Sequence, residues 1–436
     1  MTLNNAKINK SQIFNYSLFA FPLSFVGLPI YINISDFYAK KFGLELALIG
    51  LILMVVRIID VLQDIAVGYV SDFLARKKFY RQRIISISAI CLCFLFYVLF
   101  NPPNISGNFL ITIWFFAILT LTYTFFNFAV INYEAIAALV AKNQSQRIAI
   151  NSAKEFVGLL GFLVATILPF ALMQINNNSL EDGYFSLSLF FVMSILVANF
   201  FGLSKVKIDH SYQKNMAKKI NLKAVFFQKD FLIFLIIFLV NSIAVSLPTA
   251  TIIFYVEDVL DLKDKFGSFL GVYFVSAIVF MFFWKGILQK YDKIKIWIIS
   301  IIGSVLTFFL AFFLDANNAQ YFYLICFFSG IFLGPDLINP PSIIADLTQK
   351  NKNEISSFFA LYNMTSKIGL MLASSISLLI LGIYGYQPGE KSNVGQEIIP
   401  YLYAFVPCIL KLIVVGLLIV KSYARKNYQQ YHKGFV

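Results

Sequence analysis

Charged residues are scarce in this chain: they make up 13% of its 436 residues, whereas hydrophobic residues make up 59%. Because a soluble domain carries about 25% charged residues, this composition excludes a soluble protein and indicates one embedded in a membrane. Histidine is nearly absent, and both His210 and His432 lie in polar segments. A relay of histidines carrying protons across the bilayer is therefore excluded.

The four cysteines show no metal-binding spacing, and all lie in apolar runs (Cys91, Cys93, Cys326 and Cys408). We interpret them as small buried hydrophobic side chains. The sequence also lacks a phosphate-binding glycine loop, which counts against ATP-driven transport. It lacks the catalytic cluster and metal motif of a membrane-embedded enzyme such as a lipid-linked transferase, so we expect no enzyme activity. Its polar connectors are short, which disfavours a sensor or scaffold with a soluble domain.

Apolar runs long enough to cross a bilayer recur along the chain and predict an all-α polytopic membrane protein. The first, at about 13–34, is too long for a signal-peptide core and lacks a cleavage site, so we expect a retained helix, kinked around Pro22, Gly27 and Pro29. The other eleven predicted helices cover about 46–73, 84–100, 109–141, 155–173, 184–203, 231–255, 266–288, 294–314, 321–347, 356–384 and 399–420.

The net charge of +13 comes from cations that gather in short loops between these runs. This placement follows the positive-inside rule rather than a basic groove, so no nucleic-acid partner is expected and both termini should be cytoplasmic. The longest basic connector lies at the midpoint of the chain. We predict a six-helix bundle at 1–203, a basic cytoplasmic linker at 204–228, and a second six-helix bundle with a cytoplasmic tail at 229–436.

Charges also interrupt the second apolar run. Arg57, Asp60 and Asp64 are spaced i, i+3 and i+7, which places them along one helix face. Insertion scales assign roughly 2.5–3.5 kcal/mol to each such residue at the centre of a membrane helix, and so on the order of 8–10 kcal/mol to three. Such a stripe must pair or face water, and we predict that it serves the function of the protein.

The end of this run, Gly68-x3-Asp72-x2-Ala75-Arg76-Lys77, resembles the loop between helices two and three of the major facilitator superfamily, which has a glycine where this chain has Ala75. The resemblance implies a gating latch. In it Gly68 lets two helices approach, Asp72 caps or pairs across the gap, and Arg76 and Lys77 hold the inner surface.

Arg57-x2-Asp60-x3-Asp64 resembles, more narrowly, helix two of the glycoside–pentoside–hexuronide:cation symporters, the melibiose-permease-like family. The resemblance implies that Asp60 and Asp64 coordinate the coupling cation. Hard oxygen ligands one turn apart suit Na⁺, and a carboxylate pair sharing one proton suits H⁺. The family often has Asn-Asp-Pro where this chain has Gln63-Asp64-Ile65. The alternative is a structural ion pair with Arg57 or Lys367.

Helix four continues the resemblance with Tyr123-Thr124-x2-Asn127. The family has a third cation-binding acid at the place of Asn127, whose amide oxygen can still ligate Na⁺ although the site loses a charge. Glu134 lies seven residues further along the same face. It is either a second titratable group of the cavity or a solvated residue near the cytoplasmic end.

Two positions depart from the family's sugar contacts. Lys154 stands where the family carries an arginine that helps bind sugar, and a lysine cannot make the planar bidentate contact. Ser24 stands, by spacing from Tyr16, where the family has a sugar-binding acid on helix one. Both departures argue against melibiose as the substrate and leave the expected fold and transport activity standing.

In the second half, Gly334-Pro335-Asp336 and the prolines at 340 and 341 fall inside helix ten and predict a bend near the cavity. Asp336 is alternatively a contact of substrate or cation. Lys367, near the middle of helix eleven, matches a lysine of the resembled family, and we expect it to pair with the acids of helix two.

The sequence therefore predicts a major facilitator fold of twelve transmembrane helices in two pseudo-repeat halves. We expect a secondary active transporter that moves a small organic solute by alternating access, coupled to Na⁺ or H⁺ through the helix-two carboxylates, with no other cofactor. The alternative is an uncoupled facilitator or a carrier of lipid-like, amphipathic solutes, which the aromatic content of 17% and the loss of the sugar contacts keep open. We expect a monomer surrounded by lipid in a bacterial inner membrane.

Overall fold

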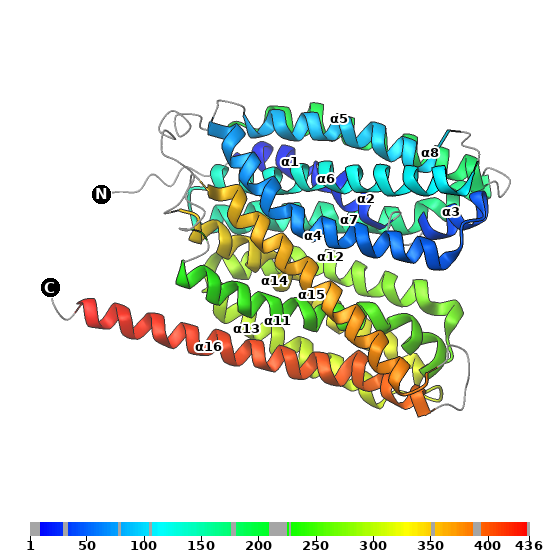
Figure 1. The fold of residues 1–436 in the computed structure, drawn as a ribbon. Coiled ribbons are helices and arrows are strands. Elements are labelled where there is room, and N and C mark those ends of the chain that lie inside the picture. Colours follow the sequence, from blue (N-terminus) through cyan, green and yellow to red (C-terminus); the bar gives the residue numbers. More distant parts are fainter. Residues whose placement is uncertain are drawn as a thin grey trace. The chain divides into compact units, whose positions relative to one another are not determined.

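The computed structural model describes residues 9–28, 34–76, 80–103, 107–175, 180–208, 225, 228–349, 354–386 and 394–433. Regular secondary structure in this part of the chain is helical throughout (Figure 1). The predicted all-α architecture is confirmed.

The helices of the first half are α1 (Lys10–Ser17), α2 (Ala20–Leu28), α3 (Ile34–Phe42), α4 (Leu46–Arg76), α5 (Arg81–Phe100), α6 (Asn108–Val140), α7 (Gln144–Ile175) and α8 (Leu180–Val197), which continues through the π-helical turn η2 (Ala198–Gly202) and the short η3 (Leu203–Lys205). Those of the second half are α11 (Lys229–Phe254) with η4 (Tyr255–Val259), η5 (Lys263–Lys265), α12 (Phe266–Lys290), α13 (Lys293–Phe308) with η6 (Phe309–Phe313), η7 (Ala319–Tyr321), α14 (Phe322–Leu347), α15 (Ile355–Ile383), η9 (Val394–Ile398), and η10 (Tyr401–Phe405) leading into α16 (Val406–Lys433).

Ten helices of the described residues are long and apolar enough to cross a membrane. The segment α1–α3 and helix α4 account for the remaining two of the twelve predicted crossings. Helix α4 is 31 residues long, ample for a bilayer, but carries the charged stripe of Arg57, Asp60 and Asp64. The segment α1–α3 is divided into short helices.

The first predicted helix is interrupted earlier than its sequence suggested. The chain turns at Leu18 and Phe19 and resumes as α2, in whose first turn Pro22 lies. In a continuous helix the backbone nitrogen of Pro22 would bond the carbonyl of Leu18, but proline has no N–H. The carbonyl of Leu18 instead accepts from the backbone N–H of Phe21 at 3.3 Å. Helix α2 continues through Gly27 to Leu28, and Pro29 lies outside the described residues.

Helix α7 begins at Gln144, well before the predicted start near residue 155. Asn143 precedes it and accepts the backbone N–H of Gln146 through its side-chain oxygen at 2.9 Å, as a helix cap does. The polar residues that follow, Arg147 and Asn151, are buried rather than solvated. The sequence interpretation left these polar residues in a loop before the predicted helix, whereas they lie on the buried face of α7.

Contacts divide the chain into two units, Met1–Phe226 with Pro341–Met364, and Phe227–Pro340 with Thr365–Val436. The boundary passes through α14 and α15, so the end of α14 and the beginning of α15 pack with the first unit. The division into bundles at 1–203 and 229–436 stays a prediction.

In the first unit α5 packs along α6 and α8, and α2 packs along α7. Aromatic side chains fill much of its interior. Tyr16 and Tyr133 stack with ring centroids 4.2 Å apart, and each hydroxyl donates to the backbone carbonyl of the other residue, at 2.9 and 2.8 Å. This reciprocal pair fixes α1 against α6.

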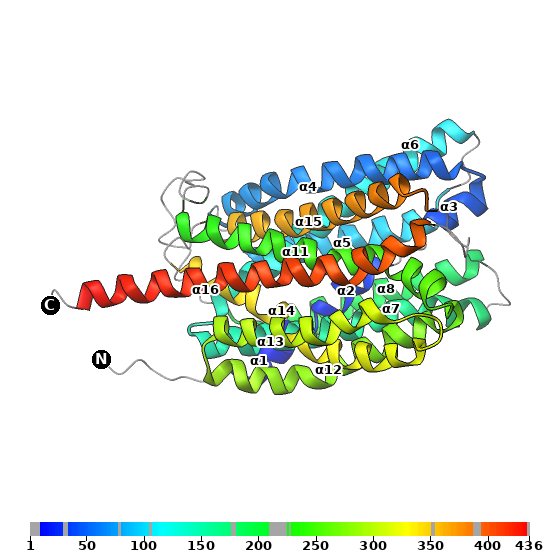
Figure 2. The same cartoon turned by 90° about the horizontal axis from the view of Figure 1, so that it is seen from below.

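In the second unit α16 runs beside α11 and α13, as both views show (Figure 1 and Figure 2). Its aromatic core includes Tyr255 and Tyr403, whose rings stack at 4.1 Å. Helices α12 and α14 approach closely at Gly330, where a Cβ atom would lie 2.2 Å from the carbonyl oxygen of Tyr273. A glycine is therefore required at that crossing.

Candidate functional site: buried charges on α4 and its partners

The two acids of the charged stripe on α4 are buried within the first unit. Asp60 is 1% exposed and Asp64 is fully buried. A guanidinium nitrogen of Arg57 lies 3.4 Å from Asp60 Oδ2, and the same guanidinium lies over the ring of Tyr123, 5.1 Å from its centroid. The ion pair lies within α4, and the cation–π contact joins the stripe to helix α6.

Helix α6 adds polar groups to the same place. The amide nitrogen of Asn127 donates to Asp60 Oδ1 at 2.8 Å, and that of Gln63 donates to the same oxygen at 3.4 Å. The hydroxyl of Thr124 donates to the amide oxygen of Gln63 at 2.8 Å. The structure therefore brings Asp60, Asn127 and, through Gln63, Thr124 together as the sequence suggested.

The oxygen-rich composition of this site suits a hard monovalent cation. Asn127 presents its amide nitrogen to Asp60, so its amide would have to turn to offer its oxygen to Na⁺. Among the described residues no cluster of three or more His, Cys, Asp or Glu side chains could hold a metal ion. A cation here would rely on the amide and hydroxyl oxygens as well as the carboxylates.

Lys367 belongs to the second unit, whereas Asp60 and Asp64 belong to the first. Its pairing with these acids stays a prediction.

Asp72 lies on α4 about three turns after Asp60. Its carboxylate makes four short contacts. It accepts from the Arg81 guanidinium at 2.8 Å, from the backbone N–H groups of Ser356 and Ser357 at 3.0 and 2.9 Å, and from the Ser357 hydroxyl at 2.7 Å. Ser356 and Ser357 lie in the first turn of α15, whose N–H groups have no partner within the helix. Asp72 therefore caps α15 from a neighbouring helix.

Gly68 lies where α4 and α15 approach closely. A Cβ atom at this position would lie 2.5 Å from Cβ of Ala360 and 3.1 Å from the backbone oxygen of Ser356. The arrangement agrees with the close approach expected of Gly68. The side chain of Arg76 and the whole of Lys77 lie outside the described residues, so their predicted part in the latch is not described.

Arg81 is a buried site residue that the sequence interpretation missed. It precedes the helix predicted at 84–100, among the cations of a short basic loop, but it is 2% exposed and lies between Asp72, Asn132 and the hydroxyl of Ser356. The sequence signal that could have found Arg81 is its place three residues before the apolar run that begins at Ile84 and nine residues after Asp72.

A second set of charges lies between α6, α7 and α15. The ammonium of Lys154 is 3.5 Å from Glu134 Oε1 and 2.9 Å from Glu155 Oε1. The amide nitrogen of Asn363 donates to Glu134 Oε2 at 2.9 Å. Glu134 is buried, so it belongs to a packed network rather than to solvent.

The start of α7 is tied to the end of α14. Arg147 forms an ion pair with Asp346, and the amide nitrogen of Asn151 donates to the hydroxyl of Ser342 at 2.9 Å. With the Asp72 and Asn363 contacts, these bonds hold residues 341–364 within the first unit.

The second unit contains a separate pair. Asp336 on α14 pairs with Lys411 on α16 and accepts from the indole nitrogen of Trp297 on α13. Lys411 also donates to the amide oxygen of Asn241 on α11 at 2.9 Å. Helix α14 continues through its prolines as one helical segment. Lys411 was missed, although a lone lysine inside an apolar run requires a partner.

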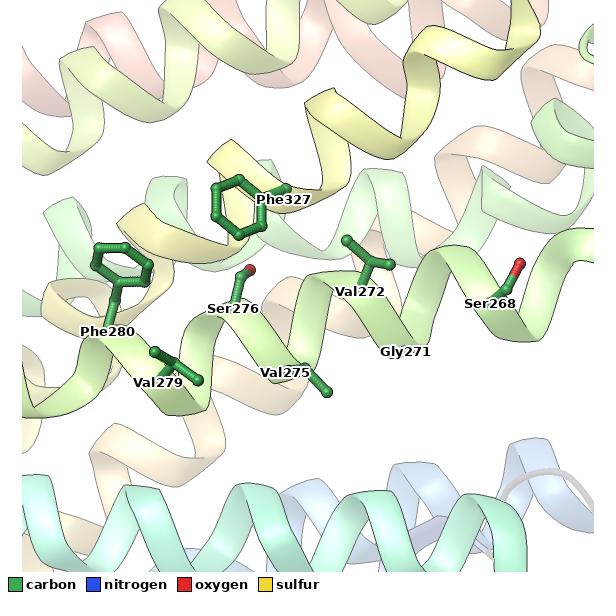
Figure 3. A pocket seen from close by; sticks show the side chains of 8 residues that line it. All are labelled: Ser268, Gly271, Val272, Val275, Ser276, Val279, Phe280 and Phe327. Atoms are coloured by element: carbon green, nitrogen blue, oxygen red, sulfur yellow. The ribbon is translucent and has the colours of Figure 1, made fainter.

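The surface of α12 carries an apolar groove of about 390 Å³ (Figure 3). Seven α12 residues line it from Ser268 to Phe280, and the ring of Phe327 from α14 closes one end beside that of Phe280. Gly271 is one of the lining residues, and a Cβ atom there would meet nothing within 4 Å.

A family model described as "MFS/sugar transport protein" matches residues 13–424. Among curated proteins, the inner membrane symporter YicJ of Escherichia coli is 22% identical over 89% of this chain and 85% of its own length. The sodium-dependent lysophosphatidylcholine symporter 1-A of Danio rerio is 23% identical over 89% of this chain and 81% of its own length.

Solved structures share the fold at low identity. A bacterial homologue of the iron transporter ferroportin, in an outward-facing state, superposes with a TM-score of 0.72 at 14% identity, covering 95% of this chain and all of that one. The major facilitator superfamily transporter FucP superposes with a TM-score of 0.67 at 13% identity, covering 92% of this chain and 97% of that one. The twelve-helix major facilitator fold predicted from the sequence is confirmed.

Proposed function

The chain belongs to the MFS/sugar transport protein family, a family of membrane transporters, and from this premise we propose that it couples the movement of a small organic solute to a cation bound at Asp60 and Asp64. The observation that carries the proposal is the burial of both acids on α4, with Asn127 contributing its amide from α6.

Charge burial supplies the coupling. A charged side chain at the bilayer centre is unfavourable by roughly 2.5–3.5 kcal/mol on insertion scales. A bound Na⁺ or H⁺ compensates one carboxylate, which lowers the free energy of conformations that enclose the stripe. A solute that binds better to the cation-loaded form is then carried with it, because coupling requires a difference in affinity between states.

Several relatives support cation coupling. The Escherichia coli and Danio rerio relatives are symporters by name, and the second is sodium-dependent. Na⁺ is therefore the ion we favour for this chain. We also propose that the protein lies in a bacterial inner membrane as a monomer, with both termini cytoplasmic.

A screen followed by an uptake measurement tests the proposal. Thermal unfolding of the purified protein is measured against sugars, organic acids, nucleosides and lysolipids, each with Na⁺ and with K⁺. The solute that stabilises the protein is then supplied to proteoliposomes with and without a Na⁺ or pH gradient. We expect accumulation only with a gradient, and equal uptake under both conditions would contradict coupling.

A second candidate substrate class is favoured by the α12 groove. Its lining is apolar along its length, and Phe280 and Phe327 place their rings 6.2 Å apart at one end. An acyl chain of an amphipathic solute fits such a surface, as the lysophosphatidylcholine in two relatives' names suggests. Gly271→Leu fills the groove without a backbone clash, since nothing lies within 4 Å of its Cβ position.

We expect Gly271→Leu to weaken stabilisation by lysolipids at least tenfold in concentration and to leave stabilisation by short polar solutes unchanged. Ile299→Trp, at an exposed position of α13 outside the groove, is the matched control. Equal lysolipid responses in both variants would remove the groove from substrate binding.

A further inference from the structure

Most ion pairs of the described residues match one acid with one base. This holds for Asp72 with Arg81, for Asp346 with Arg147, and for Asp336 with Lys411. The set between α6 and α7 differs, because two carboxylates, those of Glu134 and Glu155, face the single ammonium of Lys154. The two carboxylates together carry one more negative charge than the single ammonium compensates.

The excess charge falls on Glu134. The ammonium of Lys154 lies closer to Glu155, at 2.9 Å, than to Glu134, at 3.5 Å. The Glu134 side chain is also the less exposed, at 9% against 20%. Burial without a full counter-charge favours the neutral form of a carboxyl group.

Among the described residues, the other groups that interact electrostatically or by hydrogen bond with Glu134 do not supply a positive charge. They are the phenols of Tyr16 on α1, Tyr133 on α6 and Tyr362 on α15, together with the Asn363 amide. The Glu134 oxygens already meet an ammonium and an amide N–H, both of which would repel a metal cation. A proton is the cation that this arrangement accepts.

We propose that Glu134 is a proton-binding site, separate from the cation site at Asp60 and Asp64, and that it is loaded and unloaded once in each transport cycle. The inference rests on the proposed transport role but uses none of its cation ligands. The proton arrives from water and forms an O–H bond at the Glu134 carboxylate, with no electron transfer.

Protonation acts on α15 through Asn363. A hydrogen bond to a charged carboxylate is roughly twice as strong as one to a neutral group, so loading Glu134 weakens the Asn363 contact. That contact is one of those that hold residues 355–364 against α6 and α4, beside the Asp72 cap. Proton binding therefore loosens the beginning of α15 from the first unit.

Infrared spectroscopy of the purified protein in nanodiscs tests the site with protons as the only probe. Titrating the pH should reveal the carbonyl band of a protonated carboxylic acid that is absent in Glu134→Gln. The control Glu45→Gln, at an exposed position, should retain the band. A band that persists unchanged in Glu134→Gln, or no such band at any pH at which the protein is folded, would overturn the proposal.

Two further variants keep Glu134 and cover the case in which Glu134→Gln does not fold. Glu155→Gln leaves Lys154 to compensate Glu134 alone and should lower the pH of half-protonation by about one unit. Asn363→Ala removes a donor to the charged form and should raise it by a similar amount. Unchanged midpoints in both variants would refute the assignment.

The same samples separate this inference from the proposed function. Thermal stabilisation by Na⁺ should be lost in Asp60→Asn and retained in Glu134→Gln, whereas the protonated band should follow the opposite pattern. Loss of the band in Asp60→Asn but not in Glu134→Gln would place the proton at the α4 site and overturn the inference. A Na⁺ response that survives Asp60→Asn would contradict the cation site alone.

Discussion

Asp60 and Asp72 lie on the same helix, are equally buried, and are held in different ways. Asp72 accepts four contacts of 3.0 Å or less from a guanidinium, two backbone N–H groups and a hydroxyl. Asp60 accepts from Asn127 at 2.8 Å, and its contacts with Gln63 and Arg57 are longer, at 3.4 Å. The comparison separates an acid fixed by its surroundings from one whose looser partners can rearrange around a cation.

The same contrast distinguishes their partners. Arg81, which pairs with Asp72, is almost fully buried, whereas the Arg57 side chain is 21% exposed and can turn away from Asp60. Removing one member of a buried pair leaves an uncompensated charge, while a partly solvated partner recovers water. The two acids should therefore respond differently to substitution.

Asp72→Ala should give the largest loss of stability. It leaves Arg81 buried without its carboxylate and removes the cap of α15, and a broken buried pair costs about 3–5 kcal/mol. Thermal unfolding in nanodiscs measures the change. Asp60→Ala, compared under the same conditions, should lose clearly less, and equal losses would break the distinction between the two acids.

Lys411→Met extends the comparison to the second unit. Leaving Asp336 buried without its partner should destabilise the protein by about 3–5 kcal/mol, whereas the double change Lys411→Met with Asp336→Leu should recover most of that loss. Unfolding of the two single variants and the double variant forms the cycle. A double variant as unstable as the sum of the singles would show that the pair is not one interacting unit.

Gly68→Ala sharpens the account of the Asp72 anchor. The added methyl would meet Cβ of Ala360 at 2.5 Å, and overpacking of this kind typically costs about 1–3 kcal/mol. Gly50→Ala, on the same helix but with nothing within 4 Å, is the control and should be neutral or stabilising. If the two variants unfold together, α15 does not require the close approach.

Thr124→Val should have the smallest effect. It removes the hydrogen bond to Gln63, and a typical intramolecular hydrogen bond contributes about 0.5–1.5 kcal/mol. The freed Gln63 amide should alter the apparent Na⁺ affinity, read from thermal shifts over a Na⁺ series, more than the stability without Na⁺. An unchanged Na⁺ response would exclude Thr124 from the site.

Helix number and the charged face of α4 could be predicted from sequence because both depend on spacing along one helix. Apolar length indicates a crossing, and the i, i+3 and i+7 pattern places Arg57, Asp60 and Asp64 together whatever the fold. The expected proximity of Asn127 came from the family resemblance. These features lie within one element or follow a family pattern.

Cross-helix partners could not be predicted in the same way. Arg81 meets Ser356, and Lys411 meets Asp336, over separations of 275 and 75 residues that no local pattern encodes. Polarity was also misleading at the start of α7, where Arg147 and Asn151 are buried and paired instead of solvated. A polar residue within an apolar run predicts that it has a partner, but the sequence does not identify that partner.

The central claim is that Asp60 binds the coupling cation, and the sodium-dependent shift in thermal unfolding tests it most directly. The wild type, Asp60→Asn and Gly50→Ala are compared in Na⁺ and in K⁺ at equal ionic strength. At 100 times the dissociation constant, a bound ligand should stabilise the wild type and Gly50→Ala by about 2.7 kcal/mol, and Asp60→Asn should show no difference between the two ions. An equal sodium-dependent shift in Asp60→Asn would contradict the account.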